Sequence, residues 1–213
     1  MAQFAAGTEH VEQPEVSAVA NPMPLGMSAF AFTTALIGCI YAGFIVPSGG
    51  SSIALAAMAA IIYGGIVQLL AGMWEFRRDN TIAATLFSAY GGFLIAFGLA
   101  FVPTLGVASA LTRAGVLHTA LGLFFLCWTI FSAVLLLGSL RTNLAFLIVL
   151  ALMFLSFLLL TIGELAGASA ILLVIGGWLG IVSALVAWYV ALAGMVNGGH
   201  SVFRLPTGAM TME

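Results

Sequence analysis

Long apolar runs separated by short polar segments dominate the pattern along the 213-residue chain. Six of these runs are long enough to cross a membrane, because a helix needs about 20 apolar residues to span the hydrocarbon core. We expect the spans at 26–46, 53–74, 82–102, 116–138, 144–163 and 169–193. A β-barrel does not fit, because barrel strands alternate apolar and polar residues. The predicted fold class is an all-α integral membrane protein with six transmembrane helices.

The polar segments between the runs predict how the helices are connected. Residues 47–52 close the first run, 75–80 the second and 103–115 the third. Residues 141–143 and 164–168 are very short connections. We therefore expect their flanking helices to form tight antiparallel hairpins.

Two prolines, Pro22 and Pro24, stand just before the first apolar run. Proline fixes φ, and it disfavours helical geometry in the residue that precedes it. We therefore predict a rigid, non-helical entry through Asn21–Met23, with the long helix beginning around Gly26. The alternative is a stiff turn that only sets where the span begins.

The positions of the arginines predict the orientation of the chain. Four arginines follow the second, fourth and sixth spans, whereas Arg113 alone lies on the other side. Positive residues favour the cytoplasmic side, so both termini are expected in the cytoplasm. Residues 1–20 carry three glutamates and no lysine or arginine, which fits neither a signal peptide nor a mitochondrial presequence. We expect a flexible N-terminal tail at 1–20, a transport domain at 21–200 and a C-terminal tail at 201–213.

Composition narrows the class of function. Hydrophobic residues make up 63% and charged residues 6% of the chain, against about 45–50% and about 25% in soluble domains. The chain has no lysine, which excludes a retinal Schiff base and a phosphate-binding loop of the lysine type. Asp79 is the only aspartate, and no Gly-x-Ser-Gly nucleophile occurs, so an intramembrane protease does not fit. The net charge of −2 offers no basic surface for nucleic acid.

Polar side chains inside the spans are scarce, so each is a candidate for function. Gln68 lies on a glycine-lined helix face, and its alternative role is a hydrogen bond between helices. Tyr90 lies near the middle of the third span, where its hydroxyl needs a partner, a water or a ligand. We interpret His118 as a structural residue, and Cys39 and Cys127 as packing residues. A metal site needs several converging ligands, so we expect neither a metal nor another cofactor.

Patterned glycines indicate close helix packing. Gly163 and Gly167 form one GxxxG pair and Gly176 and Gly180 another, and small residues of this kind let helix backbones approach in lipid. From the sequence, they could serve packing within a protomer or between protomers.

No lysine or arginine lies inside a predicted span, which constrains the charge of a permeating solute. An anion would have to be met by hydroxyls, amides, helix N-termini or water, or cross after protonation. This favours a small monocarboxylate over a multiply charged metabolite.

Several motifs together resemble the acetate uptake transporter family, the acetate/succinate permeases of bacteria, archaea and fungi. The opening Asn-Pro-x-Pro-Leu-Gly at 21–26, followed by Phe30, carries the resemblance first. Further matches recur in order between residues 64 and 208. They are Gly64-Gly65-x-x-Gln68-x-x-Ala71-Gly72-x-x-Glu75, Asn80-Thr81, Tyr90-Gly91-x-Phe93, Gly177-Trp178-x-Gly180, and Asn197 with Arg204, Pro206 and Gly208.

The resemblance implies homo-hexamers of six-helix protomers, each with its own pathway through a hydrophobic constriction. By position, the constriction would be formed by Phe30, Tyr90 and Met153. The chain departs from the family pattern at Met153, Leu94 and Gly194, where leucine, tryptophan and an acidic residue are usual. A Phe/Tyr/Met ring would gate the pathway by excluding water.

Helical spacing places two sets of residues on two faces that could line one pathway. The first face comprises Phe30, Thr33, Thr34, Ile37 and Tyr41, and the second comprises Met153, Phe157, Leu160 and Glu164. Glu164 would then lie at the outer mouth of the pathway. The remaining candidates, most of them at the inner mouth, are Asn21, Gln68, Glu75, Asp79, Asn80 and Thr81.

Taken together, these features predict a transporter or channel for acetate and also succinate, coupled to protons, in the cytoplasmic membrane. The expected partners are small carboxylates, protons, the lipid bilayer and further copies of the chain. One alternative is a channel for urea or short amides. Another is a membrane scaffold or sensor that transports nothing, against which the polar residues inside the spans argue.

Overall fold

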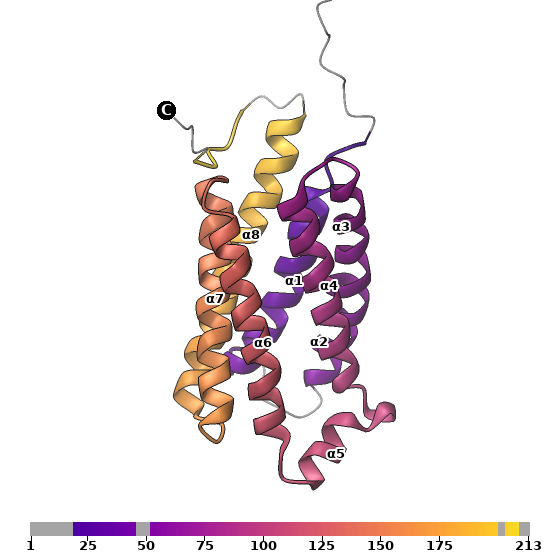
Figure 1. The fold of residues 1–213 in the computed structure, drawn as a ribbon, viewed down its shortest axis with the longest axis vertical. Coiled ribbons are helices and arrows are strands. Elements are labelled where there is room, and N and C mark those ends of the chain that lie inside the picture. The colour runs from indigo at the N-terminus through magenta and orange to yellow at the C-terminus, as the bar shows by residue number, and fades with distance from the viewer. Residues whose placement is uncertain (1–18, 46–51, 200–202, 209–213) are drawn as a thin grey trace, which may run out of the picture.

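The structure, a computed structural model, describes residues 19–45, 52–199 and 203–208, and the described residues form a bundle of helices (Figure 1). Among these residues, six helical stretches are long and apolar enough to cross a membrane, which confirms the predicted fold class. The helices are α1 (Met23–Ala42), α2 (Ser52–Ala59), η1 (Ala60–Val67), α3 (Gln68–Phe76), α4 (Thr81–Ala100), η2 (Pro103–Leu105), α5 (Val107–Arg113), α6 (Leu117–Gly138), α7 (Leu144–Leu165) and α8 (Ala170–Gly198). Residues 1–18 of the predicted tail at 1–20, most of the connection at 47–52, and residues 201–202 and 209–213 of the predicted C-terminal tail lie outside the described residues.

The first span begins earlier than the prolines led us to expect. Helix α1 starts at Met23, so the prediction of a non-helical segment through Met23 is wrong by one residue. Proline is tolerated in the first turn of a helix, where backbone N–H groups have no partner within the helix. The carbonyl of Pro22 accepts a hydrogen bond from the Gly26 N–H (3.0 Å), and the Asn21 side chain accepts one from Met23 N–H (3.1 Å). At the other end α1 stops at Ala42, because Gly43 adopts a left-handed conformation (φ 63°).

The second span is continuous but not uniformly α-helical. Its middle part, η1, is a π-helix that joins α2 to α3. Gly64 and Gly65 of η1 are buried, and a Cβ added to either would collide with side chains of α1 or α4. Wider π-helical segments are often found at functional sites.

Each span packs against two neighbouring spans, so that the six spans form a closed ring. Helix α1 packs against α8, α8 against α7, and α7 against α6, while η1 and α3 connect α1 to α4. Between α4 and α6 the backbones come close at far fewer positions than at the other joints of the ring. The centre of the ring is therefore the place where a pathway could run.

The joint between α1 and α8 is built on glycine. A Cβ on Gly38 would lie 2.8 Å from the carbonyl oxygen of Gly177, and one on Gly177 would lie 2.5 Å from the backbone nitrogen of Ala42. Gly176 packs in the same way against Leu160 of α7. The Gly176–Gly180 pair thus serves packing within the protomer, which resolves the alternative that the sequence left open. Gly167 lies in a turn with φ 76°, so the other GxxxG motif is not a packing pair.

The joint between α4 and α6 is filled by aromatic side chains. The rings of Phe93 and Phe124 stack with centroids 5.4 Å apart, and those of Phe93 and Trp128 lie 4.8 Å apart. Phe97 continues the same layer toward Phe125, at 6.0 Å. Aromatic pairs at these distances attract each other and fill the space that the backbones leave.

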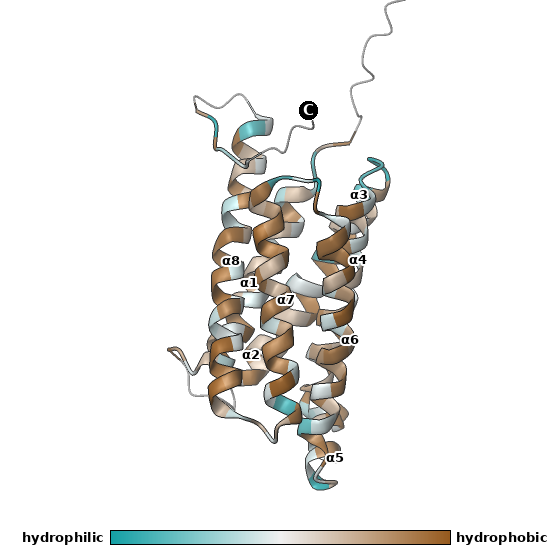
Figure 2. Ribbon diagram, turned by 60° about the vertical axis from the view of Figure 1, so that its left-hand side comes forward, coloured by the Kyte–Doolittle hydropathy of each residue, from teal (hydrophilic) through white to brown (hydrophobic). Residues whose placement is uncertain are grey.

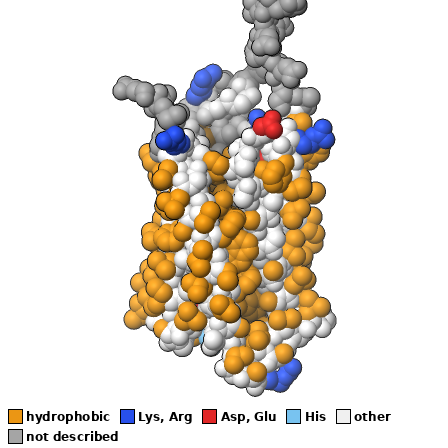
Figure 3. Space-filling model, viewed as in Figure 1, with side chains coloured by type: hydrophobic (Ala, Val, Ile, Leu, Met, Phe, Trp, Pro, Cys, Tyr) orange, Lys and Arg blue, Asp and Glu red, His pale blue; other side chains and the backbone are white. Residues whose placement is uncertain are grey.

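Charged and polar residues gather at the two ends of the bundle. Hydrophilic positions concentrate at the helix ends and connections (Figure 2), and hydrophobic side chains cover the flank of the molecule (Figure 3). Arginine side chains mark both ends in this view (Figure 3). The third connection, at 103–115, contains the short helices η2 and α5.

The C-terminal segment 203–208 is hydrogen-bonded to the last part of α8 and to the first turn of α7. The Asn197 side chain exchanges two hydrogen bonds of 2.9 Å with the backbone N–H and carbonyl of Leu205. The carbonyls of Gly208 and Thr207 accept hydrogen bonds from the N–H groups of Leu144 and Ala145, at 2.9 and 3.1 Å. These N–H groups belong to the first turn of α7, which has no partners for them within the helix. The C-terminal segment therefore caps α7.

Candidate functional site

A small buried cavity of about 30 Å³ lies at the centre of the ring. It is lined by both faces that helical spacing predicted, α1 through Thr34, Ile37 and Tyr41, and α7 through Met153 and other residues. The remaining lining residues are Gly38, Phe93, Leu94, Phe97, Phe125, Ser156, Phe157, Leu160, Gly176, Gly177 and Gly180. A cavity of this size can hold a water molecule but not a hydrated anion.

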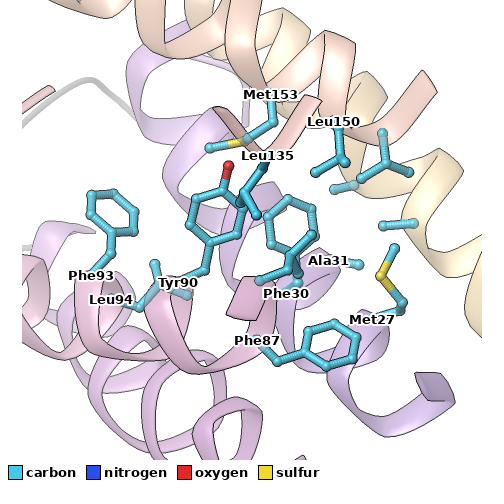
Figure 4. Close-up of a cluster of buried hydrophobic side chains, with 14 of the residues drawn as sticks. Met27, Phe30, Ala31, Phe87, Tyr90, Phe93, Leu94, Leu135, Leu150 and Met153 are labelled. Carbon is cyan, nitrogen blue, oxygen red and sulfur yellow. The ribbon is translucent and has the colours of Figure 1, made fainter. Parts of the chain in front are cut away.

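Phe30, Tyr90 and Met153 come together beside this cavity, and all three are buried. The rings of Phe30 and Tyr90 stack with centroids 5.8 Å apart. Figure 4 shows the Tyr90 hydroxyl directed toward the side chains of Met153 and Leu135. The structure thus brings the three predicted gate residues to one place, and their role as a gate stays a prediction.

The hydroxyl of Tyr90 has a protein partner. It lies 2.8 Å from Oγ of Ser132 on α6, and Ser132 is also buried. The Tyr90 ring contacts Phe93, Trp128, Phe131 and Phe157 in addition to Phe30. Sequence analysis missed Ser132, although a hydroxyl inside an apolar span is the kind of signal that could have identified it.

A second and larger cavity, of about 410 Å³, lies at the end of the bundle where α6 begins and α7 ends. It shares Ile37, Tyr41 and Phe97 with the central cavity, so the two are adjacent. Its polar groups include the side chains of Tyr41, His118 and Glu164. We call this space the Glu164 vestibule.

Three polar side chains in the Glu164 vestibule are connected. Nδ1 of His118 lies 2.7 Å from Oε2 of Glu164, and the Tyr41 hydroxyl donates to Oε1 of the same carboxyl group at 3.3 Å. The Glu164 side chain is only 3% exposed, whereas that of His118 is 54% exposed. His118 is thus paired with Glu164 at the mouth of a cavity. The sequence could have indicated this pairing, because His118 lies near the start of the fourth span and Glu164 near the end of the fifth span, and antiparallel neighbours bring these two ends together.

The opposite end of the bundle holds the polar residues predicted at the inner mouth. Oε2 of the fully buried Glu75 accepts a hydrogen bond of 2.9 Å from Asn80, whose own Oδ1 caps α4 at Ala83. Arg78 donates to Oδ1 of Asn21 at 2.7 Å.

A cavity of about 150 Å³ adjoins this end of the bundle. Asn80 lines it together with residues from the starts of α1, α4 and α7. Asp79 and Thr81, the neighbours of Asn80 in the chain, are exposed. The predicted inner-mouth residues thus lie close together, and their part in a pathway remains a prediction.

Gln68 and Thr33 lie away from the described cavities. Gln68 is fully buried, and neither its amide nitrogen nor its amide oxygen has a hydrogen-bond partner among the described residues. The Thr33 hydroxyl faces the second span, where it donates a long bond of 3.5 Å to the Ala59 carbonyl. Thr34, one residue further, lines the central cavity instead. Their predicted pathway roles stay untested.

Metal chemistry finds no support in the part of the chain that the structure describes. No three His, Cys, Asp or Glu side chains among the described residues are placed to hold a metal ion.

Comparison with known proteins shows one family over nearly the whole chain. Residues 3–212 match the model of the GPR1/FUN34/yaaH family. The chain is 39% identical over 203 residues to acetate permease A of Emericella nidulans, an alignment covering 90% of this chain and 67% of that protein. It is 34% identical to the succinate-acetate/proton symporter SatP of Escherichia coli K12, covering 89% of this chain and 96% of the symporter.

A solved structure agrees with the arrangement of helices. The structure of the bacterial acetate channel SatP superposes with a TM-score of 0.74 at 30% sequence identity. The match covers 89% of this chain and 99% of that chain. The chain spans about two thirds of the length of the fungal permease and nearly all of the bacterial proteins.

Proposed function

Because this chain belongs to the GPR1/FUN34/yaaH family, we propose that it carries acetate and related short carboxylates across a membrane together with protons. It is a multi-pass membrane protein of six apolar helical stretches. The observation that carries the proposal is the pair of adjacent cavities, the smaller of which lies beside the cluster of Phe30, Tyr90 and Met153. A protein that only packed helices would need no such enclosed space.

The chemistry of the central cavity favours an uncharged solute. Its lining is dominated by Phe, Leu, Ile, Met and Gly, and the hydroxyl of Ser156 already donates to the Gly176 carbonyl at 2.8 Å. Transferring an unpaired carboxylate from water into such surroundings costs roughly tens of kcal/mol of Born solvation free energy. Transferring an unpaired neutral polar group costs only about 2–7 kcal/mol. Protonating a carboxylate with an ordinary pKa near 4 costs roughly 4 kcal/mol at pH 7. Passage as the neutral acid is therefore the easier route, and it carries one proton with each carboxylate.

The arginines support an orientation with both termini in the cytoplasm. Arg77, Arg78, Arg141 and Arg204 belong to the end that holds both ends of the described chain, and Arg113 belongs to α5 at the other end. The Glu164 vestibule would then face outward and the Asn80 cavity inward. Maleimide labelling tests this in spheroplasts of a parent lacking Cys39 and Cys127. S109C should react from outside and S201C should be protected, although Ser201 itself lies outside the described residues. Labelling of S201C alone would reverse the orientation.

Assembly into hexamers is part of the proposal and rests on the family resemblance. The Gly176–Gly180 face is occupied within the protomer, so contacts between protomers must use other surfaces of the helices. Native mass spectrometry of the detergent-solubilised protein should show a species near six protomer masses. A monomer that still transports would contradict this assembly.

The proposed transport is tested with purified protein in proteoliposomes. Uptake of labelled acetate should exceed that of protein-free liposomes, and it should rise as the external pH falls at fixed total acetate. The same vesicles should take up labelled urea no faster than protein-free liposomes do. Uptake of urea alone would support the amide-channel alternative, and uptake of neither solute would support a scaffold. Acetate uptake that does not change with pH would indicate diffusion of the anion instead.

A further inference from the structure

The Glu164 vestibule offers more than an entrance to the central cavity. Its lining brings together Tyr41 from α1, His118 from α6 and Glu164 from α7. The described lining residues of α2, α4 and α8 are apolar and carry no charge. Among the described residues that line the vestibule, Tyr41 is therefore the only further titratable side chain that faces the His118–Glu164 pair.

The geometry gives the two ring nitrogens of His118 different roles, hydrogen bonding for Nδ1 and proton exchange for Nε2. With Glu164 ionised, its carboxylate can only accept, so Nδ1 of His118 carries a hydrogen and donates it across 2.7 Å. The other nitrogen, Nε2, is then free to bind or release a proton. Carboxylates that hold an imidazole in this way fix its tautomer and stabilise its protonated form. The Tyr41 hydroxyl, 3.3 Å from Oε1, keeps the carboxyl group in place.

The exposure of the two side chains fits this division. Glu164 is 3% exposed and shielded from the medium, whereas His118 is 54% exposed and can exchange protons with water. Histidine is the side chain that ordinarily changes its charge between about pH 5 and 8. The vestibule thus contains a side chain that can be protonated again from one side of the membrane.

We propose that His118, held by Glu164, donates a proton to the carboxylate of the substrate in the vestibule before the substrate enters the apolar constriction. In this step the proton leaves Nε2 of the imidazolium and binds a carboxylate oxygen, which yields the neutral acid and a neutral imidazole. Nε2 then takes up a proton from the medium on the vestibule side, relayed by water. The neutral acid passes Phe30, Tyr90 and Met153 and releases its proton beyond them. The inference rests on the proposed transport function and assigns the residue through which protons enter.

The test measures how initial acetate uptake in proteoliposomes depends on external pH, from about pH 5 to about pH 8 at fixed total acetate. In the parent protein, uptake should rise as pH falls and then level off once His118 is protonated. In H118Q, only acid formed in bulk solution can enter. Uptake should therefore be lower at neutral pH by about tenfold or more. It should continue to rise about tenfold per pH unit without levelling off.

A second variant keeps the inference testable if H118Q folds poorly. In E164Q the carboxylate that accepts the hydrogen bond from Nδ1 is lost, so the imidazole is no longer held with Nε2 free, and uptake at neutral pH should fall toward that of H118Q. T119V, which changes the exposed neighbour of His118 on α6, is the matched control and should follow the parent curve. Gel filtration and thermal melting of each variant report whether the fold is intact.

The outcomes separate the two proposals. If the parent takes up no more acetate than protein-free liposomes, the transport function itself fails. If the parent transports acetate but H118Q and E164Q both keep its pH curve, His118 is not the proton donor and the transport function stands. A loss of rate that is equal at all pH values would assign the pair a purely structural role and would also overturn the inference.

Discussion

Two helix–helix contacts of the ring, α1–α8 and α4–α6, differ in what fills the space between the helices. At α1–α8 the backbones touch through Gly38 and Gly177, and the space between them has no room for a Cβ atom. At α4–α6 the backbones stay apart, and rings such as Phe93 and Trp128 fill the gap. Backbone contacts cannot be rearranged without moving a helix, whereas side chains can change rotamers.

The difference indicates which part of the ring is fixed and which part can adapt. The Tyr90–Ser132 hydrogen bond joins α4 to α6 within the aromatic layer, next to the constriction. A substrate that passes between Phe30, Tyr90 and Met153 therefore needs movement of side chains rather than of the glycine joint. We expect substitutions at the glycine joint to damage the fold and substitutions in the aromatic layer to change transport.

The largest effect is expected for G177V. Its Cβ would lie within 2.5–2.9 Å of Ala42, Gly38 and Tyr41, two of these contacts being to backbone atoms that cannot yield. We expect the protein to lose about 3 kcal/mol or more of stability, or not to accumulate as a monodisperse species. Thermal melting in detergent and gel filtration provide the measurement. The control is G92A, because a Cβ there meets nothing within 4 Å. A G177V protein that melts like G92A would show that the joint is not rigid.

An intermediate effect is expected when the constriction is widened by F30A or M153A. Both side chains are buried beside the central cavity, so truncation should admit larger acids such as lactate and succinate. Their uptake relative to acetate should rise by roughly tenfold. The matched control is F32A, since Phe32 lies on the same helix but is 42% exposed and points away from the core. Unchanged selectivity in both folded variants would make Phe30 and Met153 ordinary core residues.

The smallest effect is expected for the hydrogen bond between the two aromatic-layer helices. Y90F keeps the ring stacked on Phe30 but removes the hydroxyl that lies 2.8 Å from Ser132. A neutral hydrogen bond contributes about 1 kcal/mol, so acetate uptake should fall by less than about tenfold and larger acids should stay excluded. A double-mutant cycle with S132A measures the coupling. Effects that simply add would show that the pair does not act together.

Much of the fold could be predicted because membrane-spanning helices leave a strong signal in the sequence. The six spans and the short hairpins follow from apolar length, and helical spacing identified several of the residues that line the central cavity. The start of α1 at Met23 could not be read from Pro22 and Pro24, since proline is compatible with the first turn of a helix. The π-helical geometry of η1 depends on contacts with α1 and α4 that no local pattern records.

The site was less accessible to sequence reasoning because its partners come from different helices. Phe30, Tyr90 and Met153 were placed together only through family resemblance, and the structure shows them adjacent. The partners of Tyr90 and Glu164, namely Ser132 and His118, require knowledge of which helices are neighbours in the ring. Gln68 shows the reverse case, because a polar residue in a span need not line a cavity.

The capping of α7 by residues 203–208 has a consequence for the order in which the protein is completed during synthesis. The carbonyls of Thr207 and Gly208 bind the N–H groups of Leu144 and Ala145, but the ribosome makes them only after the whole of α8. Until residue 208 has been made, the first turn of α7 is therefore capped only by the side chain of Asn143, which accepts a hydrogen bond from Phe146 N–H. It follows that the cap is absent from any nascent chain that stops before residue 207.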